Sequence, residues 1–599
     1  MTSYVYRPLR NGEIRLFNLS LGSLDDPLVG RLTHHSVDAG VPSYTALSYV
    51  WGNAISHVPA RILPNASKCI TFNLECALRH LRSLDSEILL WVDALCINQD
   101  DNAEKAQQVG LMRDIYAMAS EVVAFLGNER CKLSGATKLA SLNAEDRAVT
   151  GSGSGPCLTD FLDWARTKDQ DSVWHGLFSV LCSSWFSRLW IIQEALVARK
   201  LSFRCGTESV SVQALAGLVS EIPHTVSPSL RGNSAEQEAW KYMLNSIGLI
   251  RKIASRNLVG AHTRHKADLL ELLWNYRGHK ASKARDHLFA LLGLANVPYN
   301  TLLSPDYTSN LEVVIYRYAR FFVEFDKDPI RLLYSARGIS NDDRFPSWIP
   351  NWILDEEEPG RSCHIACRFL TPAKRFYSAA LSTPPSMRIG KTDNVVIVTG
   401  SIFSYLTVLG DSHWEEVDQE DNHVQRCLAY IQESDHFVHK LSTYPTGEEL
   451  EDVKIRLLVG NRAWNPGLSY TYLEDDYVRQ YKNFRQNFEH TRKPQQRLIA
   501  LFDAAKNKEK TIGYINALLN MTDVRLCRTK NGYLGLGPPG AQTGDAVCII
   551  NGSCVPFVLR SSPDVKGSFQ LVGKCYIHGI MEGEAMQIKD LVQKQISLV

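Results

Sequence analysis

The sequence predicts an α/β fold in which a mainly parallel sheet is flanked by helices. A largely helical region and a small C-terminal antiparallel β region are predicted to follow it. Three observations support this class. Residues 88–92 form an apolar run that is typical of a strand buried on both faces. Strand-like and helix-like segments alternate over residues 69–127. Near the C-terminus, Gly, Pro and Asp turns recur at a spacing of roughly ten residues, which favours a small barrel or sandwich.

The chain has 599 residues, too many for one hydrophobic core, so we expect several domains. The predicted divisions are an N-terminal β extension (1–43), an α/β domain (44–206) with a loop insertion at about 128–158, a mainly helical region (207–390), a mixed α/β region (391–520) and a C-terminal β barrel or sandwich-like region (521–599).

Composition narrows the functional classes. With 45% hydrophobic residues, 22% charged residues and a net charge of +1, the chain is typical of a globular protein and has no global field for nucleic acid. Its 14 cysteines have no repeated spacing, which indicates reduced thiols. Neither a leader nor a membrane span is predicted, so we expect a cytoplasmic protein. Cys363, His364 and Cys367 have no matching second pair of ligands, so no metal site is predicted.

Individual elements follow from local patterns. Strands are predicted at 13–19, 29–37, 44–53, 69–73, 88–98, 121–127 and 201–205, and helices at 73–83, 102–119, 422–443 and 493–520. Asp101 and Glu104 have the spacing of a capping box at the start of the helix 102–119. Arg285 and Asp286 open a short apolar helix, and an ion pair at its start is the simplest interpretation.

The tryptophan-rich stretch 183–198 is the most informative part of the chain. Placed on a helix, it forms an apolar stripe made of Trp185, Leu189, Ile192 and Leu196. Glu194 lies almost opposite that stripe, and Trp190 precedes it by four residues on the same side. A surface or salt-bridged glutamate is one interpretation. The alternative is a cleft in which an aromatic face and a carboxylate hold a flat, cationic ring.

Polar residues also follow two of the predicted strands, where an α/β fold usually forms its binding crevice. The first group contains Ser48, Tyr49, Trp51 and Gly52, and the second contains Asp93, Cys96, Asn98 and Gln99. Asp93 is equally well explained as an Asx turn or a cap. Asn98 and Gln99 are also explained as residues that satisfy the loop before the next helix.

Three blocks in this region resemble the heterokaryon incompatibility (HET) domain of filamentous fungi. They are YTALSYVWGN, LWVDALCINQDDNAEKAQQVGLMRDIYAMASEVVAFLG and WFSRLWIIQEALVA with RCG at 204–206, and they occur in this order within residues 44–206. Later segments, including ARDHLFALLGL and PSWIPNW, also resemble such proteins. The predicted α/β domain is thereby identified as a HET domain.

The resemblance implies a role in fungal non-self recognition, in which HET domains trigger growth arrest or cell death. HET domains are distantly similar to TIR domains, whose enzymes cleave NAD⁺ with a glutamate that follows a tryptophan by four positions. This implies a TIR-like fold, Glu194 as the catalytic residue, and NAD⁺ or a related nucleotide as substrate without a separate cofactor. The implied substrate-binding residues are Ser48, Tyr49, Trp51, Gly52, Asp93, Cys96, Asn98, Gln99, Trp190 and Gln193.

Within that set, Trp190 or Trp51 would stack on a ring of the substrate, and Gln193 would orient the side chain of Glu194. The alternative is a non-enzymatic signalling module that acts by self-association or by binding an unidentified allorecognition partner. A third interpretation is a degenerate protein whose C-terminal part only recognises a partner.

Overall fold

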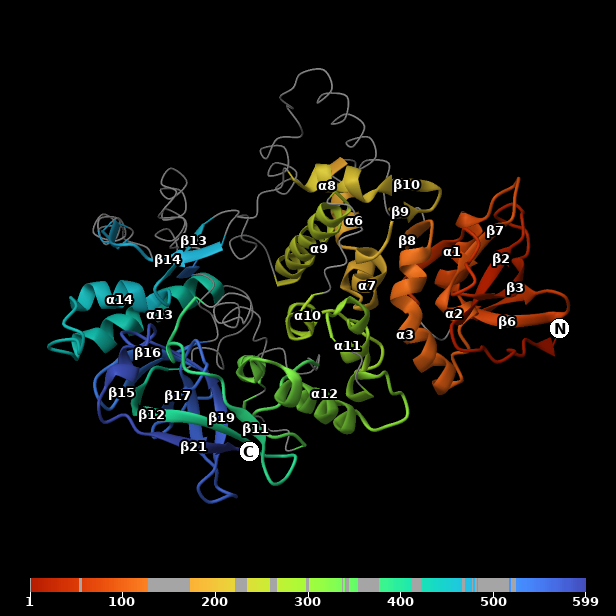
Figure 1. Ribbon diagram of the computed structural model, residues 1–599. Helices are drawn as coiled ribbons and strands as arrows, with labels where there is room; N and C mark the ends of the chain where they lie inside the picture. The colour runs from red at the N-terminus through yellow and green to blue at the C-terminus, as the bar shows by residue number, and fades with distance from the viewer. Residues whose placement is uncertain are drawn as a thin grey trace. The chain divides into compact units, whose positions relative to one another are not determined.

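The structure is a computed structural model that divides into two compact units (Figure 1). Unit 1 comprises residues 1–228 and 235–310, and unit 2 comprises residues 229–234 and 311–599. The residues described are 2–52, 57–127, 173–220, 234–258, 267–297, 301–336, 338–339, 344–353, 376–411, 422–465, 469–476, 478–479, 482, 517–518 and 524–599. The predicted loop insertion at 128–158 and the cysteines and histidine at 363–367 lie outside them, as does nearly all of the helix predicted at 493–520.

Unit 1 contains a ten-stranded sheet with the order β1-β6-β5-β3-β2-β7-β4-β8-β9-β10. Its strands are β1 (Thr2–Ser3), β2 (Glu13–Leu19), β3 (Val29–Ser36), β4 (Thr45–Tyr49), β5 (His57–Ile62), β6 (Ala66–Thr71), β7 (Ile88–Trp91), β8 (Glu121–Gly127), β9 (Leu201–Cys205) and β10 (Glu208–Ser211). Residues 1–43, which we predicted as a separate extension, supply three of these strands. Strands β1, β5 and β10 were not predicted from the sequence.

The four neighbouring strands β7, β4, β8 and β9 are all parallel, as their apolar sequences predicted. The flanking strands differ, because β2 pairs antiparallel with both β3 and β7, and β10 pairs antiparallel with β9. The sheet is therefore mixed, with a parallel centre. Leu90, Trp91, Ala46 and Ala124 are fully buried there.

The order of these four strands creates a topological switch point. Helix α1 (Phe72–Leu81) leads into β7 on one side of β4, and helix α3 (Asn102–Met118) carries the chain from β7 to β8 on the other side. Because these connections run in opposite directions, they cover opposite faces of the sheet. In open α/β sheets a ligand crevice forms between the carboxyl ends of such strands, here β4 and β8.

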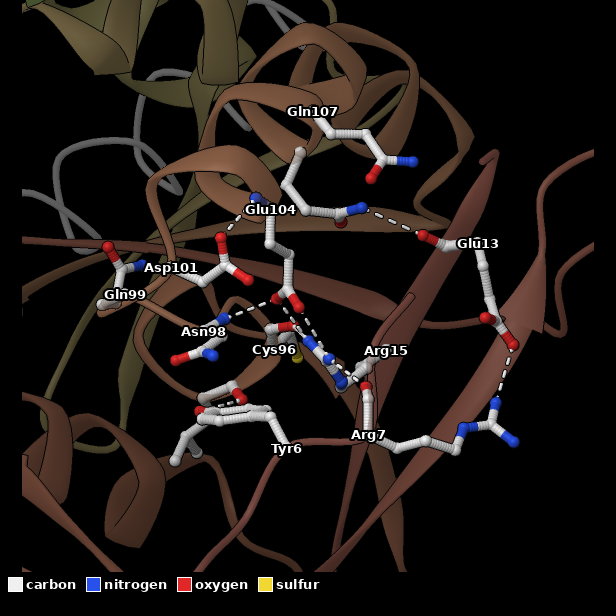
Figure 2. Close-up of polar contacts among 12 residues, drawn as sticks. Tyr6, Arg7, Glu13, Arg15, Cys96, Asn98, Gln99, Asp101, Glu104 and Gln107 are labelled. Carbon is white, nitrogen blue, oxygen red and sulfur yellow. Dashed lines mark hydrogen bonds and ion pairs between the residues drawn. The ribbon is translucent and has the colours of Figure 1, made fainter. Parts of the chain in front are cut away.

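The start of α3 was only partly predicted. Asp101 is the N-cap residue, and its carboxylate accepts the backbone N–H groups of Ala103 (2.9 Å) and Glu104 (3.1 Å). Glu104 does not complete a capping box. Its carboxylate instead accepts two hydrogen bonds from Arg15 and one from the backbone N–H of Asn98 (Figure 2). The capping-box spacing gave a wrong prediction for Glu104 because Arg15, which lies on β2 and is distant in the sequence, binds its carboxylate.

The stretch 183–198 is not one helix. It forms a 3₁₀ turn η1 (Ser184–Ser187), a break, and helix α7 (Trp190–Leu196). The break is held by Lys280, whose backbone N–H donates to Ser187 (2.6 Å) and whose carbonyl accepts from Leu189 (2.9 Å). All residues of α7 after Trp190 are buried, so the apolar stripe does not mark a single core face and Glu194 is enclosed.

Unit 1 also contains α2 (Asp93–Cys96), α6 (Val173–Leu181), α8 (Val212–Ser220), α9 (Ser234–Leu258), α10 (Leu269–Tyr276), α11 (Asp286–Phe289), η3 (Leu292–Leu294) and η4 (Thr301–Leu303). Unit 2 has the helices α12 (Leu311–Phe325), η5 (Pro329–Ser335), α13 (Asn422–His439), α14 (Leu450–Leu458) and η8 (Glu584–Gln587). No described helix is long and apolar enough to cross a membrane.

The strands of unit 2 are β11 (Met387–Ile389), β12 (Val396–Leu409), β13 (Arg462–Asn465), β14 (Ser469–Tyr472), β15 (Arg525–Thr529), β16 (Leu534–Gly537), β17 (Ala546–Ile550), β18 (Phe557–Ser561), β19 (Phe569–Lys574), β20 (Tyr576–Ile577) and β21 (Gln593–Leu598). Strand β12 pairs with both β17 and β21, and β18 and β19 connect those two, which closes a ring of five strands. The C-terminal β region therefore needs β12, which lies in the region that we predicted as mixed α/β.

Candidate functional site

Glu194 meets Ser48 at the carboxyl end of β4. The Ser48 hydroxyl donates a hydrogen bond to Oε2 of Glu194, and the indole N–H of Trp185 donates to the Ser48 Oγ (2.8 Å). These side chains are almost fully enclosed, with 2% of Glu194 and 1% of Ser48 exposed. The tryptophan connected to this carboxyl is therefore Trp185, on the 3₁₀ turn, through Ser48.

Trp190, the expected neighbour of Glu194, binds a different carboxylate. Its indole N–H donates to Oδ2 of Asp286 (3.2 Å), and the Tyr307 hydroxyl donates to Oδ1 of the same residue (2.9 Å). Arg285 does not form the predicted ion pair with Asp286 in α11, since its guanidinium donates to the carbonyl of Asp306 (3.2 Å). Asp286 is thus a second buried carboxyl, held by two aromatic donors.

The charge of Glu194 is poorly compensated. Nη1 of Arg188 lies 3.9 Å from Oε2 of Glu194, beyond hydrogen-bonding distance, and has no hydrogen-bond partner among the described residues. Burial raises the pKa of Glu194 to about 7. The charge of Arg188 and the Ser48 hydrogen bond act against this rise, and the charge of Asp93 adds to it. Near neutral pH the side chain is therefore divided between its acid and its carboxylate.

Asp93 lies at the end of β7 and faces the same arginine. Its carboxylate accepts the indole N–H of Trp51 (2.8 Å), the backbone N–H of Ala94 (2.7 Å) and the hydroxyl of Tyr49. Burial raises the pKa of Asp93, and the charge of Arg188 opposes that rise. The contact with Ala94 shows a local capping role, while the contacts with Tyr49 and Trp51 connect the ends of β4 and β7.

Three of the predicted residues lie at the end of α2 and in the loop that follows it. Cys96 is buried, and burial raises the pKa of its thiol to about 12, far from a reactive thiolate. The backbone N–H of Asn98 donates to Glu104 (2.7 Å), and the side-chain amide of Gln99 donates to the carbonyl of Asp93 (3.0 Å). Any contact of these three residues with a ligand stays a prediction.

Gly52 and Gln193 occupy close-packed positions. Gly52 has φ +75°, and a Cβ there would lie 2.6 Å from Nδ2 of Asn73, so only glycine fits without strain. Gln193 is buried and packs against Gly293, where a Cβ would lie 2.2 Å from its Oε1. That oxygen has no hydrogen-bond partner among the described residues. This packing gives no support to the predicted orienting role of Gln193.

A cavity of about 230 Å³ opens at the switch point between β4 and β8. It is lined by Tyr49, Val50, Phe72, Asn73, Cys76, Phe125, Leu126, Gly127 and Ser184. Tyr49 contributes both to this cavity and to the Asp93 contacts, and Ser184 directly precedes Trp185. The hydrogen-bonded carboxyls and the cavity therefore share the end of β4.

Several charged residues near these carboxyls were not predicted as site residues. Arg188 is marked in the sequence as the single cation within the apolar run SSWFSRLWIIQEALVA. Lys105 was noted only because it follows Glu104 near a pocket-forming loop, and no sequence signal marks Lys283. Both lie close to Asp286, but they are separated by more than half of unit 1 in the sequence and meet only on folding.

Comparisons with known proteins agree with this architecture. The family model described as "Heterokaryon incompatibility protein (HET)" matches residues 44–194, and the "Het-6 beta-barrel domain" matches residues 466–594. The chain therefore contains a segment similar to the HET family and a later segment similar to the Het-6 barrel family.

Among curated proteins, the chain is similar to heterokaryon incompatibility protein 6, OR allele, of Neurospora crassa. The two are 25% identical over 618 aligned positions, which cover 91% of this chain and 90% of the relative. No solved structure matches the chain significantly.

Proposed function

We propose that this protein is an effector of heterokaryon incompatibility whose HET domain cleaves NAD⁺, with Glu194 as the catalytic residue. The proposed outcome for the cell is arrest or death after fusion with an incompatible partner. The family match and the similarity to the Neurospora protein support the incompatibility role. The buried, weakly paired carboxyl at the end of β4 supports the choice of catalytic residue.

The reaction needs little from the protein besides a well-placed carboxylate. When the bond between nicotinamide and ribose breaks, its electron pair leaves with nicotinamide, and positive charge develops on the ribose ring. Ionised Glu194 would stabilise that charge. Water then attacks the ribose carbon and loses its proton, and the products are ADP-ribose, nicotinamide and one proton.

The observation that carries the proposal is the incomplete pairing of Glu194. Its carboxyl accepts a hydroxyl from Ser48, and its nearest cation, Arg188, is at 3.9 Å. A carboxylate whose negative charge is only weakly paired within the protein interacts most favourably with a cationic group on a ligand. The location also fits, because the end of β4 is the switch point where α/β folds bind ligands.

The test is nicotinamide release from NAD⁺ by the purified full chain. Glu194→Gln keeps the shape and removes the charge, so we expect release to fall by at least about a hundredfold. Glu121→Gln is the matched control. Glu121 accepts a hydroxyl from Ser202 (2.7 Å) in the same sheet, but lies at the opposite end of the parallel strands. Equal release by the wild type and Glu194→Gln would refute the proposed role.

A second function, recognition without catalysis, is favoured by the burial of Glu194. With 2% of the side chain exposed and one oxygen bonded to Ser48, the carboxyl also suits an internal tie between α7 and β4. Under this alternative the full chain would self-associate in sedimentation experiments and release no nicotinamide. Release that depends on Glu194 would exclude it.

A further inference from the structure

Two lysines from distant parts of unit 1 meet over one tyrosine ring. Nζ of Lys105, in the first turn of α3, lies 5.0 Å from the ring centroid of Tyr307, and Nζ of Lys283 lies 5.3 Å from it. The two ammonium groups are close enough for the charge of Lys283 to lower the pKa of Lys105. Tyr307 is fixed in turn by its hydroxyl, which donates to the buried Asp286.

This arrangement is electrostatically incomplete. Neither lysine forms an ion pair within 4.0 Å among the described residues, although Asp286 acts on both lysines and Asp93 acts on Lys105 from farther away. Burial and the neighbouring charge of Lys283 lower the pKa of Lys105. Two like charges at this separation repel each other, and a bound anion would convert the repulsion into two favourable contacts.

The position of the lysines relates them to the proposed catalytic residue. Hydrogen bonds connect the two regions, because Tyr307 and Trp190 both donate to Asp286, and Trp190 begins helix α7, which carries Glu194. On one side, Lys105 and Lys283 place two positive charges near one carboxyl, that of Asp286. On the other side, Asp93 and Glu194 place two carboxyls near one cation, Arg188. A ligand that matches both sides carries a positive ring and a negative diphosphate.

We propose that Lys105 and Lys283 form an anion site that binds the diphosphate of a dinucleotide whose cationic ring faces Asp93 and Glu194. This inference rests on the proposed function for the identity of the ring, but the anion site can be tested separately. The two ammonium groups supply the positive charge, and Tyr307 supplies the rigid surface that holds them together. Lys283 is exposed and Lys105 is half-buried, so an anion can reach them.

The experiment is calorimetric titration of the full chain with inorganic pyrophosphate. We expect the dissociation constant to rise about tenfold in Lys105→Gln and in Lys283→Gln, the loss typical of one charge-assisted contact. Lys200→Gln is the matched control, because Lys200 pairs with Glu121 (3.2 Å) away from Lys105 and Lys283 and should bind pyrophosphate like the wild type. Equal thermal midpoints would show that the variants are folded.

Activity measurements separate this inference from the proposed function. The lysine variants should raise the KM for NAD⁺ about tenfold with little change in kcat, whereas Glu194→Gln should lower kcat and leave pyrophosphate binding intact. Pyrophosphate binding that depends on the lysines, without any NAD⁺ cleavage, would retain the anion site and refute the proposed function. Absent binding, or equal binding by the wild type and both lysine variants, would overturn the anion site.

Discussion

Two of the buried glutamates of unit 1, Glu104 and Glu194, lie beside arginines in different ways. Glu104 accepts hydrogen bonds from both terminal nitrogens of Arg15, at 2.6 and 2.9 Å, and from the backbone N–H of Asn98 (Figure 2). Glu194 accepts a hydrogen bond from the hydroxyl of Ser48, and Nη1 of the neighbouring Arg188 lies 3.9 Å from its Oε2. Both side chains are at least 90% buried.

The difference extends to the arginines. Arg15 also donates to the carbonyls of Cys96 (3.0 Å) and Arg7 (2.6 Å), and its guanidinium lies 4.7 Å from the ring of Tyr6. Each arginine has one buried nitrogen without a hydrogen-bond partner among the described residues, Nε of Arg15 and Nη1 of Arg188. The pairs differ at the carboxylate, because Glu104 accepts both terminal nitrogens of its arginine and Glu194 accepts none from its own. A carboxylate that its arginine binds through both oxygens stabilises one arrangement of the chain, whereas a weakly paired one can bind or react. The comparison therefore assigns a structural role to Glu104.

Breaking the ion pair between Arg15 and Glu104 should have the largest effect on stability. Glu104→Gln leaves the buried Arg15 without its countercharge, and we expect a loss of about 3–5 kcal/mol in the free energy of unfolding. Urea unfolding followed by tryptophan fluorescence measures it. A loss below about 1 kcal/mol would contradict the structural role that we assign to Glu104.

Removing the charge of Glu194 should increase the stability of the fold instead of reducing it. Because the pKa of Glu194 is about 7 in the folded chain, against 4.5 as its ordinary value, the folded state retains a proton that the unfolded state loses. Stability therefore falls as the pH rises from about 4.5 to about 7, and Glu194→Gln lacks this loss.

We expect the variant to be about 3 kcal/mol more stable than the wild type at about pH 8, with the difference disappearing near pH 4. Unfolding measured at both pH values tests this. A variant that is less stable at the higher pH would show that the ionised carboxylate stabilises the fold, which contradicts the comparison.

The smallest expected effect concerns the hydrogen bond that remains to Glu194. Ser48→Ala removes a donor that favours the ionised form, so the pKa of Glu194 should rise further. The pH dependence of nicotinamide release should shift upward by about half to one unit. Ser202→Ala, which acts on Glu121, is the control and should cause no shift. A shift to lower pH in Ser48→Ala would contradict the assigned direction.

Much of the fold was predictable because local patterns determine it. The period of the apolar residues located β2, β8 and α3, and turn residues near the C-terminus indicated antiparallel strands. The single helix predicted at 183–198 was wrong, because a helical stripe argument assumes one exposed face and α7 has none. The backbone contacts of Lys280 that break this stretch come from more than eighty residues away and leave no local signal.

The sequence predicted which residues of the site lie near one another better than it predicted their individual contacts. The ends of β4 and β7 and the α7 glutamate were selected correctly as neighbours, since Ser48 contacts Glu194 and Tyr49 and Trp51 contact Asp93. The stacking role of Trp190 stays a prediction, but its indole hydrogen bond was not foreseen. Helical spacing pointed to Trp190, but the 3₁₀ turn brings Trp185 to Ser48 and directs Trp190 to Asp286.

The measurement that tests the account most directly is the pH dependence of nicotinamide release by the full chain. If ionised Glu194 performs the cleavage, kcat/KM should rise about tenfold per pH unit below about pH 7 and level off above it, and Glu194→Gln should abolish that rise. A flat profile, or the same profile in the wild type and Glu194→Gln, would contradict the central claim.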